Sequence, residues 1–214
     1  EGVREPLGMS GNRLEVNVHV ITGAVTSAQN IIKSVNRAGL DVVDIILQPL
    51  ASSEAVLSAE ERELGVAMVD LGGGTTDLAI FLDGSIRHTA VLPIGGQNLT
   101  KDLAIGLLTS QTDAEKIKVQ HGIARTELVH GHQMVEVPSV GDRPPRQFTR
   151  RDIAEILEPR VEEMFDLVKR EIVRAGYEGM LGAGVVITGG TSLLEGMPDA
   201  AERGLNLPAR RGMP

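Results

Sequence analysis

The sequence predicts an α/β fold, in which buried strands alternate with amphipathic helices. Two apolar segments lead directly into glycine-rich turns, one within residues 65–77 and the other within residues 184–192. Between them, apolar residues recur at helical spacing over residues 153–172, which predicts one long helix with a single buried face. Strands that end in tight turns, alternating with helices of this kind, are typical of a sheet covered by helices.

The composition excludes several classes of protein. The chain has 214 residues, of which 42% are hydrophobic, so it is long and apolar enough to bury a core. Its net charge of −8 argues against a general nucleic-acid surface, which requires a basic patch. It has no cysteine, no apolar run of about 20 residues and no signal peptide, a pattern that fits a cytoplasmic protein. Because it begins with Glu1, we expect the chain to be part of a longer protein.

The first part of the chain is predicted to hold two strands and two helices. Polar and apolar residues alternate over residues 12–22, which predicts a half-buried strand. A capping-box spacing from Thr26 predicts the start of a helix, and the β-branched run over residues 40–47 predicts a second strand. Pro49 suits the first turn of the helix that follows. The charged residues 60–63 are expected to form a solvated connector.

A turn of three glycines and two threonines separates the next two apolar runs, with an aspartate on each side. The turn residues are Gly72, Gly73, Gly74, Thr75 and Thr76. Glycine lets backbone amides approach an anion closely, and the threonines add hydroxyl donors. Asp70 and Asp77 would repel a bound phosphate unless a cation lay between them, so we expect Mg²⁺ held through water. The alternative is a β-hairpin with a glycine-rich turn, but the two aspartates favour a nucleotide phosphate.

After this motif the sequence predicts a strand meander and then helices. Asp83 and Gly84 form a two-residue hairpin signal, so the strand over residues 85–93 is expected to pair with the preceding one. Thr149 and Asp152 have the spacing that marks the start of the long helix. The elements predicted in between are helices over residues 98–108 and 112–122 and a strand pair within residues 127–140.

The second glycine turn has no aspartate beside it. It follows a buried strand, precedes a helix, and contains Gly189, Gly190 and Ser192. Without a charge, it suits a flat, uncharged group such as an adenine or a sugar lying on the backbone. An ordinary strand–helix turn explains this motif equally well when it is taken alone. The two turns together, about a hundred residues apart, favour one nucleotide held at both ends.

Both turns resemble motifs of a known superfamily. Residues 70–77 look like the second phosphate loop of the superfamily of actin, sugar kinases and heat-shock chaperone ATPases, and residues 186–196 resemble its adenosine motif. The resemblance implies a ribonuclease-H-like, actin-type ATPase subdomain, which has a mixed five-stranded sheet with flanking helices and an inserted smaller α+β subdomain. It also implies that Gln48 positions the attacking water, and that Glu115 and Lys118 contact the ribose and adenine.

Segments outside the nucleotide motifs indicate a branch of this superfamily. Residues 47–57, 137–146 and 158–160 are similar to the FtsA family of actin-like bacterial cell-division proteins. This resemblance implies a scaffold that binds ATP with Mg²⁺, polymerises, and links FtsZ filaments to the membrane. It implies at most slow ATP hydrolysis, with the nucleotide mainly structural. It places the protein in the cytoplasm, at the inner face of the cell membrane at the division septum.

The same resemblance implies a division of the chain and a set of partners. The C-terminal peptide of FtsZ would contact the inserted subdomain, where Arg150, Arg151 and Arg160 would pair with its carboxylates. Alternatively, Arg160 forms a salt bridge within its own helix. Other implied partners are further copies in filaments and other division proteins, but no nucleic acid. The expected subdomains are the end of a preceding one (residues 1–23), the nucleotide-holding one (24–113 and 182–214) and the inserted one (114–181).

Two features of the family are missing from this sequence, the first phosphate loop and the C-terminal amphipathic helix that anchors the family to the membrane. We therefore expect the chain to match the second half of the family, and membrane contact to run through a helix outside it. The alternative function is a metabolic phosphotransferase of the same superfamily, such as a sugar or acetate kinase. A kinase needs a catalytic base facing the γ-phosphate; no insertion before Asp70 supplies one, but the missing first half of the protein could. A chaperone-type ATPase is a third option.

Overall fold

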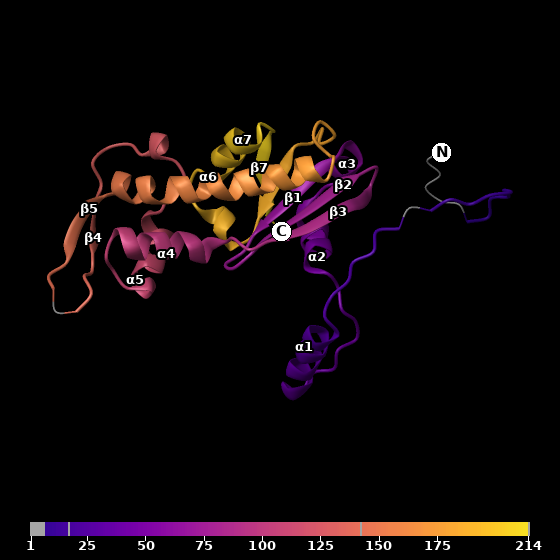
Figure 1. Ribbon diagram of the computed structural model, residues 1–214, viewed down its shortest axis with the longest axis horizontal. Coiled ribbons are helices and arrows are strands. Elements are labelled where there is room, and N and C mark those ends of the chain that lie inside the picture. Colours follow the sequence, from indigo (N-terminus) through magenta and orange to yellow (C-terminus); the bar gives the residue numbers. More distant parts are fainter. Residues whose placement is uncertain (1–6, 17, 142, 214) are drawn as a thin grey trace. The chain divides into compact units, whose positions relative to one another are not determined.

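A computed structural model describes residues 7–16, 18–141 and 143–213 of the chain. The chain divides into two units, Glu1–Val43 and Asp44–Pro214. In its described residues the first unit contains one helix, α1 (Val25–Arg37). All the other described helices and strands lie in the second unit (Figure 1).

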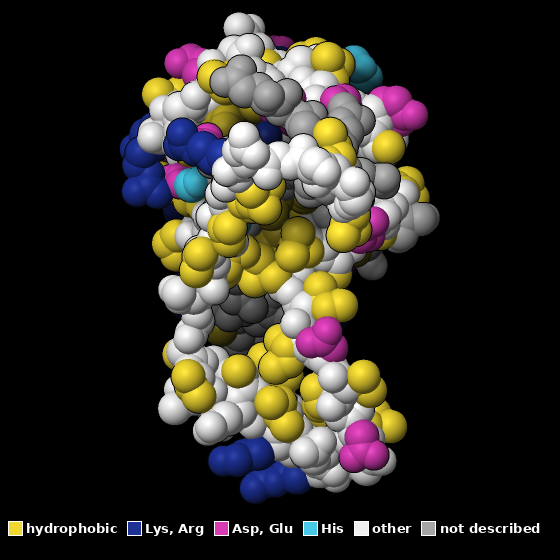
Figure 2. Space-filling view, turned by 90° about the vertical axis from the view of Figure 1, so that its right-hand side faces the viewer, with side chains coloured by type: hydrophobic (Ala, Val, Ile, Leu, Met, Phe, Trp, Pro, Cys, Tyr) yellow, Lys and Arg dark blue, Asp and Glu magenta, His cyan; other side chains and the backbone are white. Residues whose placement is uncertain are grey.

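The two strands predicted for the first part of the chain do not form. Over the described residues, segments 12–22 and 40–47 have no strand, and Asn17 lies outside the described residues. Most of their apolar side chains stay exposed, Leu14 by 74% and Val18 by 72%. Hydrophobic side chains are visible at the surface of one face of the molecule in Figure 2. Alternation predicts which face of a strand is apolar, but a strand also needs a neighbour for its hydrogen bonds. Neither segment pairs with a strand among the described residues.

Two helix starts differ from the prediction. α1 begins one residue before Thr26 and has no side-chain cap, so the capping box predicted there is wrong. The charged segment 60–63, predicted to be a connector, lies in α3 (Ala59–Leu64). The Ser58 side chain accepts from the amide of Glu61, while the Glu61 side chain accepts from the amide of Ser58. This reciprocal capping box explains why a run of charges starts a helix.

The mixed five-stranded sheet predicted for the chain is confirmed, with the strand order β3-β2-β1-β6-β7. β1, β2 and β3 form an antiparallel meander, whereas β6 lies parallel to both β1 and β7. Asp83 and Gly84 have φ angles of 52° and 72° and form the predicted hairpin turn between β2 and β3. The strands are β1 (Val66–Leu71), β2 (Thr76–Leu82), β3 (Ser85–Leu92), β6 (Val185–Thr188) and β7 (Ala209–Arg211).

Helices cover both faces of this sheet. α2 (Gln48–Val56) packs against β1 and β2, with Pro49 in its first turn as predicted. On the other face lie α6 (Arg150–Arg174) and α7 (Met197–Leu205), which follows the short helix η2 (Gly190–Leu193). The elements between β3 and α6 are α4 (Gly96–Gly106), α5 (Gln111–His121), the short helix η1 (Thr126–Leu128) and the antiparallel pair β4 (Met134–Val137) and β5 (Arg146–Thr149).

The predicted long helix is α6, which links the two sheets of the second unit. Thr149 caps it by accepting from the amide of Asp152, as predicted. Its apolar face is buried and packs against α4, α7, β3 and β5. Figure 1 shows α6 running from the β4–β5 pair to the large sheet. Among the helices in the described part of the chain, none combines the length and apolar character needed to cross a membrane.

The two faces of the large sheet carry separate cores. All six residues of β1 are buried, because this strand lies between β2 and β6 with helices on both sides. Successive side chains of a strand alternate between faces, so Val66 and Met68 join the core under α2. Ala67 and Val69 join the core that contains the apolar face of α6. Asp70 continues the first series and therefore points towards α2, where a buried carboxylate needs polar partners.

Candidate functional site

The candidate site lies where β1 and β6 end and β2 begins. Asp70 is paired with Asp77 across the antiparallel β1–β2 ladder, and with Thr188 across the parallel β1–β6 ladder. Residues directly opposite each other share a face of the sheet, with Cβ atoms about 4.5–5.5 Å apart. The two aspartates that bracket the turn in the sequence are therefore neighbours in space.

The carboxylate of Asp70 is held from two sides. Gln48 Nε2 and Ser52 Oγ, one turn apart on α2, each donate to its Oδ2 at 3.1 Å. Gly189 lies against Oδ1, since a Cβ on this glycine would stand 2.3 Å from that oxygen. Asp70 is only 6% exposed, so these contacts fix the orientation of a nearly buried carboxylate.

Asp77 lies beside Asp70 but accepts fewer hydrogen bonds. Its Oδ2 accepts one hydrogen bond, from Thr75 Oγ1 at 3.2 Å. Burial raises the pKa of Asp77 against the effect of this hydrogen bond, and the nearby charge of Asp70 adds to the rise. A divalent cation near the pair would relieve the repulsion. Over the described residues no three His, Asp or Glu side chains converge as a metal site, so such a cation would take further ligands from water or phosphate.

The glycine turn uses its carbonyls and leaves amides free. Gly72 O accepts from the amide of Gly96 at 2.9 Å, and Gly73 O accepts from the amide of Gln97 at 2.8 Å, both at the start of α4. Within the described part of the chain, the amides of Gly73 and Gly74 donate to no backbone carbonyl. A Cβ on either of these two glycines would meet open space. Free amides in an open, tight turn form a nest that suits an anion such as a phosphate.

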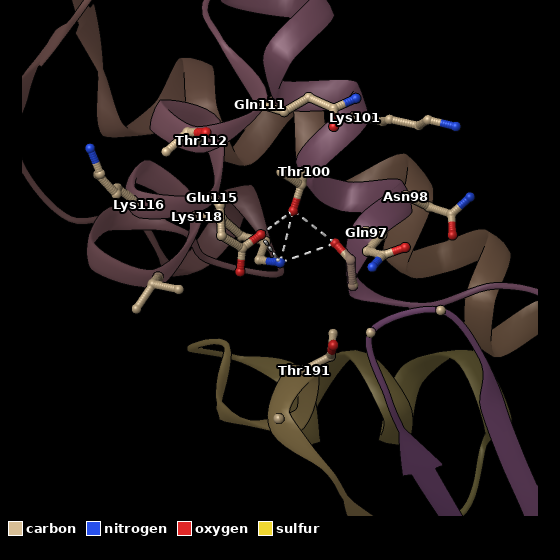
Figure 3. Close-up of a pocket in the computed structure, with 15 residues that line it drawn as sticks. Gln97, Asn98, Thr100, Lys101, Gln111, Thr112, Glu115, Lys116, Lys118 and Thr191 are labelled. Carbon is tan, nitrogen blue, oxygen red and sulfur yellow. Dashed lines mark hydrogen bonds and ion pairs between the residues drawn. The ribbon is translucent and has the colours of Figure 1, made fainter. Parts of the chain in front are cut away.

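A pocket of about 950 Å³ opens beside this turn (Figure 3). Five of the predicted site residues line it: Gly73 and Gly74 from the first turn, Glu115 and Lys118 from α5, and Gly190 from the second turn. The charged residues that line it are three lysines and one glutamate, so the pocket is positive within a chain of net charge −8. That balance suits an anionic ligand.

One hydrogen-bonded group ties α5 to α4 inside the pocket (Figure 3). Lys118 Nζ donates to Gly96 O at 3.0 Å, to Thr100 Oγ1 at 2.9 Å and to Glu115 Oε2 at 2.8 Å. The Thr100 hydroxyl also donates to Glu115 Oε2. Burial by itself raises the pKa of Glu115, but the hydrogen bonds from Lys118 and Thr100 and the charge of Lys118 outweigh it and lower the pKa. Glu115 is therefore an oriented carboxylate.

Several predicted residues are not brought to this pocket. Thr76 is buried, and its hydroxyl donates to Ile94 O at 2.8 Å. Ser192 is 2% exposed, and its hydroxyl donates to Gly189 O at 2.7 Å. Because each hydroxyl has one hydrogen, neither donates to a phosphate or sugar in this arrangement. The predicted residues that lie at the end of the sheet without lining the pocket are Gln48, Asp70, Gly72, Thr75, Asp77 and Gly189.

The three arginines predicted to bind a peptide have acidic partners within the chain. Arg160 forms a bidentate contact with Asp102, at 2.7 and 3.2 Å, and an ion pair with Glu163. Hydrogen bonding to Asp102 raises the pKa of Arg160. The other two pairs are Arg150 with Glu195 and Arg151 with Glu155. The salt bridge within the helix of Arg160 is therefore present, and the peptide role of the arginines stays a prediction.

Sequence reasoning missed the residues that join the two turns. Thr191 Oγ1 donates to Gly72 O at 2.9 Å, and a Cβ on Gly96 would stand 2.4 Å from the Thr191 hydroxyl. Two further hydroxyls donate to the predicted carboxylates: Ser52 on α2 donates to Asp70, and Thr100 on α4 donates to Glu115. Gly95 and Gly96, at the start of α4, are the signal that could have pointed to this junction, because glycine at a helix start often marks a close approach of backbone.

Comparisons with known proteins relate most of the chain to one family. The family model described as "Cell division protein FtsA" matches residues 67–214, and the one described as "SHS2 domain inserted in FTSA" matches residues 1–22. FtsA of Pseudomonas aeruginosa is 54% identical over 214 residues, which are 100% of this chain and 51% of that protein. FtsA of Escherichia coli K12 is 45% identical over 221 residues, covering 100% of this chain and 53% of that protein. The chain thus spans about half the length of the curated relatives it matches.

Solved structures with the same fold come from several actin-like proteins. MreB5 of Spiroplasma citri bound to ADP matches with a TM-score of 0.71 at 18% identity, covering 89% of this chain and 61% of that one. The MamK double helical filament matches with a TM-score of 0.70 at 14% identity, covering 90% and 61%. The ethanolamine utilization protein EutJ of Carboxydothermus hydrogenoformans matches with a TM-score of 0.67 at 26% identity, covering 89% and 57%. The predicted actin-type fold is confirmed.

Proposed function

The chain belongs to the FtsA family of cell division proteins, and from this premise we propose that it is part of an actin-like scaffold that binds ATP with Mg²⁺ and polymerises at the division septum. The observation that carries the proposal is the turn of Gly73 and Gly74, whose free amides lie beside two paired aspartates. Family membership favours this scaffold over a metabolic phosphotransferase. ATP hydrolysis would be slow, with the nucleotide mainly structural.

The phosphate end of the nucleotide would lie over the amides of Gly73 and Gly74. Asp70 and Asp77 would hold Mg²⁺ through water, and the cation supplies the positive charge that lets a phosphate approach two carboxylates. Gln48 keeps its Nε2 on Asp70, so its amide oxygen is left to accept from a water molecule near the phosphate. These residues bind, orient and neutralise charge, and no covalent step on the protein is needed.

The adenosine end would lie between Gly190 and α5. Gly190 offers a backbone surface without a side chain, because a Cβ there would meet open space. Glu115 offers a carboxylate from the opposite side of the same pocket. Gly189 and Ser192 support this end through the packing of Gly189 on Asp70 and the hydrogen bond of the Ser192 hydroxyl to Gly189 O.

The proposed partner is the C-terminal peptide of FtsZ, received by the inserted subdomain of residues 114–181. One feature that supports a peptide site is a hollow of about 240 Å³ beside the bidentate pair of Arg160 and Asp102. Its lining combines the apolar side chains of Ile156 and Pro159 with one guanidinium and two carboxylates, so Arg160 would have to exchange Asp102 or Glu163 for a carboxylate of the peptide. The residues that line it are Asp102, Ile156, Pro159, Arg160 and Glu163.

Calorimetric titration with ATP tests the nucleotide proposal. The chain should bind ATP more tightly in Mg²⁺ than in EDTA. Asp70→Ala should remove this difference and weaken the affinity for Mg-ATP at least tenfold, or about 1.4 kcal/mol. Asp166→Ala is the matched control, because Asp166 is an exposed acid on α6 that does not line the nucleotide pocket. Equal affinity of the two variants, or no difference between Mg²⁺ and EDTA for the unchanged chain, would contradict the proposal.

A second titration tests the partner proposal. A peptide with the C-terminal sequence of FtsZ should bind the folded chain, and Arg160→Ala should weaken that binding. Arg151→Ala is the comparison, since among the described residues Arg151 pairs only with the exposed Glu155. If a sample that shows cooperative unfolding does not bind the peptide, this role of the chain is excluded.

A further inference from the structure

Thr100 is the centre of the hydrogen-bonded group in the pocket. This threonine on α4 is 7% exposed, and its Oγ1 accepts from Lys118 Nζ at 2.9 Å. The same hydroxyl contacts two acceptors, Glu115 Oε2 and Gly96 O, the latter at 3.1 Å. It has one hydrogen to donate, and a carboxylate is the stronger acceptor because it is charged. The hydroxyl is therefore directed at Glu115.

Lys118 has no N–H group left for a ligand. An ammonium has three donors, and all three are used within the protein, on Gly96, Thr100 and Glu115. The side chain is 12% exposed, so water cannot readily replace these partners. Lys118 therefore acts as a support for Glu115, in contrast to the direct nucleotide contact expected from the sequence.

All three members of this group line the pocket, and Glu115 is the most exposed of them. Its side chain is 50% exposed, and both internal hydrogen bonds go to one oxygen, Oε2. In the described part of the chain no hydrogen bond is made to Oε1. Figure 3 shows the side chains of Glu115, Lys118 and Thr100 converging on one another within the pocket. An ionised carboxylate accepts hydrogen bonds and donates none, so its free oxygen suits a hydroxyl group.

We propose that Thr100 is a positioning residue, which together with Lys118 holds Glu115 as the acceptor for a ribose hydroxyl of the bound nucleotide. This inference rests on the proposed function and adds a preference for ribose over deoxyribose. A site built to hydrogen-bond a hydroxyl discriminates strongly against an analogue without it, because its polar group is then left unpaired. Within this group the discrimination comes from Glu115, since the donors of Lys118 are occupied.

The first test compares sugars in Thr100 variants. ATP, 2′-deoxyATP and 3′-deoxyATP are titrated calorimetrically into the unchanged chain, Thr100→Val and Thr100→Ser. The unchanged chain should bind at least one deoxy analogue tenfold or more weakly than ATP. Thr100→Val keeps the side-chain shape without the hydroxyl and should reduce that ratio several-fold, whereas Thr100→Ser should keep it. A merely structural role for Thr100 would weaken all three ligands equally, which would overturn the proposal.

The second test needs no nucleotide. A pH titration of the Glu115 carboxyl, followed by carbon NMR, should show a higher pKa in Thr100→Val and an unchanged pKa in Thr100→Ser, because only valine removes the donor. An equal pKa in both variants would overturn the positioning role, and a raised pKa with an unchanged sugar ratio would overturn the specificity. A raised pKa in a chain that binds no ATP would support the positioning of Glu115 and contradict the proposed function instead.

Discussion

The two glycine turns follow neighbouring parallel strands, yet their glycines serve different purposes. In the first turn, Gly73 and Gly74 face open space, and their amides are free among the described residues. In the second turn, Gly189 has a φ of 84° and stands against the side chain of Asp70 and the carbonyl of Leu71. The first turn is open to the approach of a ligand, whereas the start of the second is closed because a carboxylate packs there. Two similar glycine-rich sequences therefore have different structures: the first turn is accessible from outside, and the start of the second is closely packed.

The largest effect is expected from Gly189→Ala. Alanine at a positive φ costs about 1–2 kcal/mol, and its Cβ would lie 2.7 Å from Leu71 O, so overpacking of about 1–3 kcal/mol adds to that cost. Urea unfolding should show a loss of more than about 2 kcal/mol. A loss below 0.5 kcal/mol, about the size of an ordinary surface effect, would show that the second turn is not closed as described.

The next effect concerns the link between the turns. Thr191→Val removes the hydrogen bond from Thr191 Oγ1 to Gly72 O and should lower the free energy of unfolding by about 1 kcal/mol. Thr191→Ser keeps the hydroxyl and serves as the control in the same unfolding experiment. If the Thr191→Val and Thr191→Ser variants have equal free energies of unfolding, the two turns are held together by backbone packing and not by this side chain.

Asp77→Asn should stabilise the chain slightly at neutral pH. The pKa of Asp77 is raised by burial and by Asp70, so its contribution to stability is present at acidic pH and is lost as pH rises through the pKa of the folded state. Removing a charge directly opposite another in a sheet is worth about 0.2–1 kcal/mol. Unfolding curves measured from about pH 3 to pH 7 should show the gain only at the upper end. A gain that is equal at all pH values would contradict the repulsion between the two aspartates.

The smallest effect on stability is expected from Gly190→Ala. Its Cβ would meet open space, so unfolding should change by less than about 0.5 kcal/mol. If the adenosine lies on this backbone, the same substitution should weaken ATP binding clearly. An unchanged affinity in this folded variant would place the adenosine elsewhere in the pocket. Together, Gly189→Ala and Gly190→Ala test the two glycines of the second turn separately, the first for close packing and the second for access by a ligand.

Local patterns were enough to predict four strands of the large sheet and the long helix, whereas the five-stranded sheet as a whole was implied by the family resemblance. The glycine turns, the Asp83-Gly84 hairpin and the cap at Thr149 all depend on residues close in sequence. The strand at residues 12–22 was wrong because alternation reports one face and says nothing about a neighbouring strand. The strand β7 was not predicted, because its three residues are too few to show an alternation of polar and apolar side chains.

The candidate site was predictable in its backbone and less so in its side chains. The aspartates bracket the turn, so their proximity follows from a hairpin register. Which of two adjacent threonines faces inward depends on the residue at which β2 begins, and Thr76 turned out to be buried. Two of the three donors of Lys118 go to Thr100 and Gly96 on α4, which lie 18 and 22 residues earlier in the chain, and sequence spacing cannot report these contacts.

Gly96 is the point at which these parts meet. Its amide donates to the first turn, its carbonyl accepts from α5, and its Cα leaves room for Thr191 of the second turn. The first turn, α5 and the second turn all contact Gly96. A movement of any one of them away from the pocket would therefore break its contacts with the others. The amides of Gly96 and Gln97 should then exchange with solvent on the timescale of unfolding of the whole second unit, and not on that of a local opening.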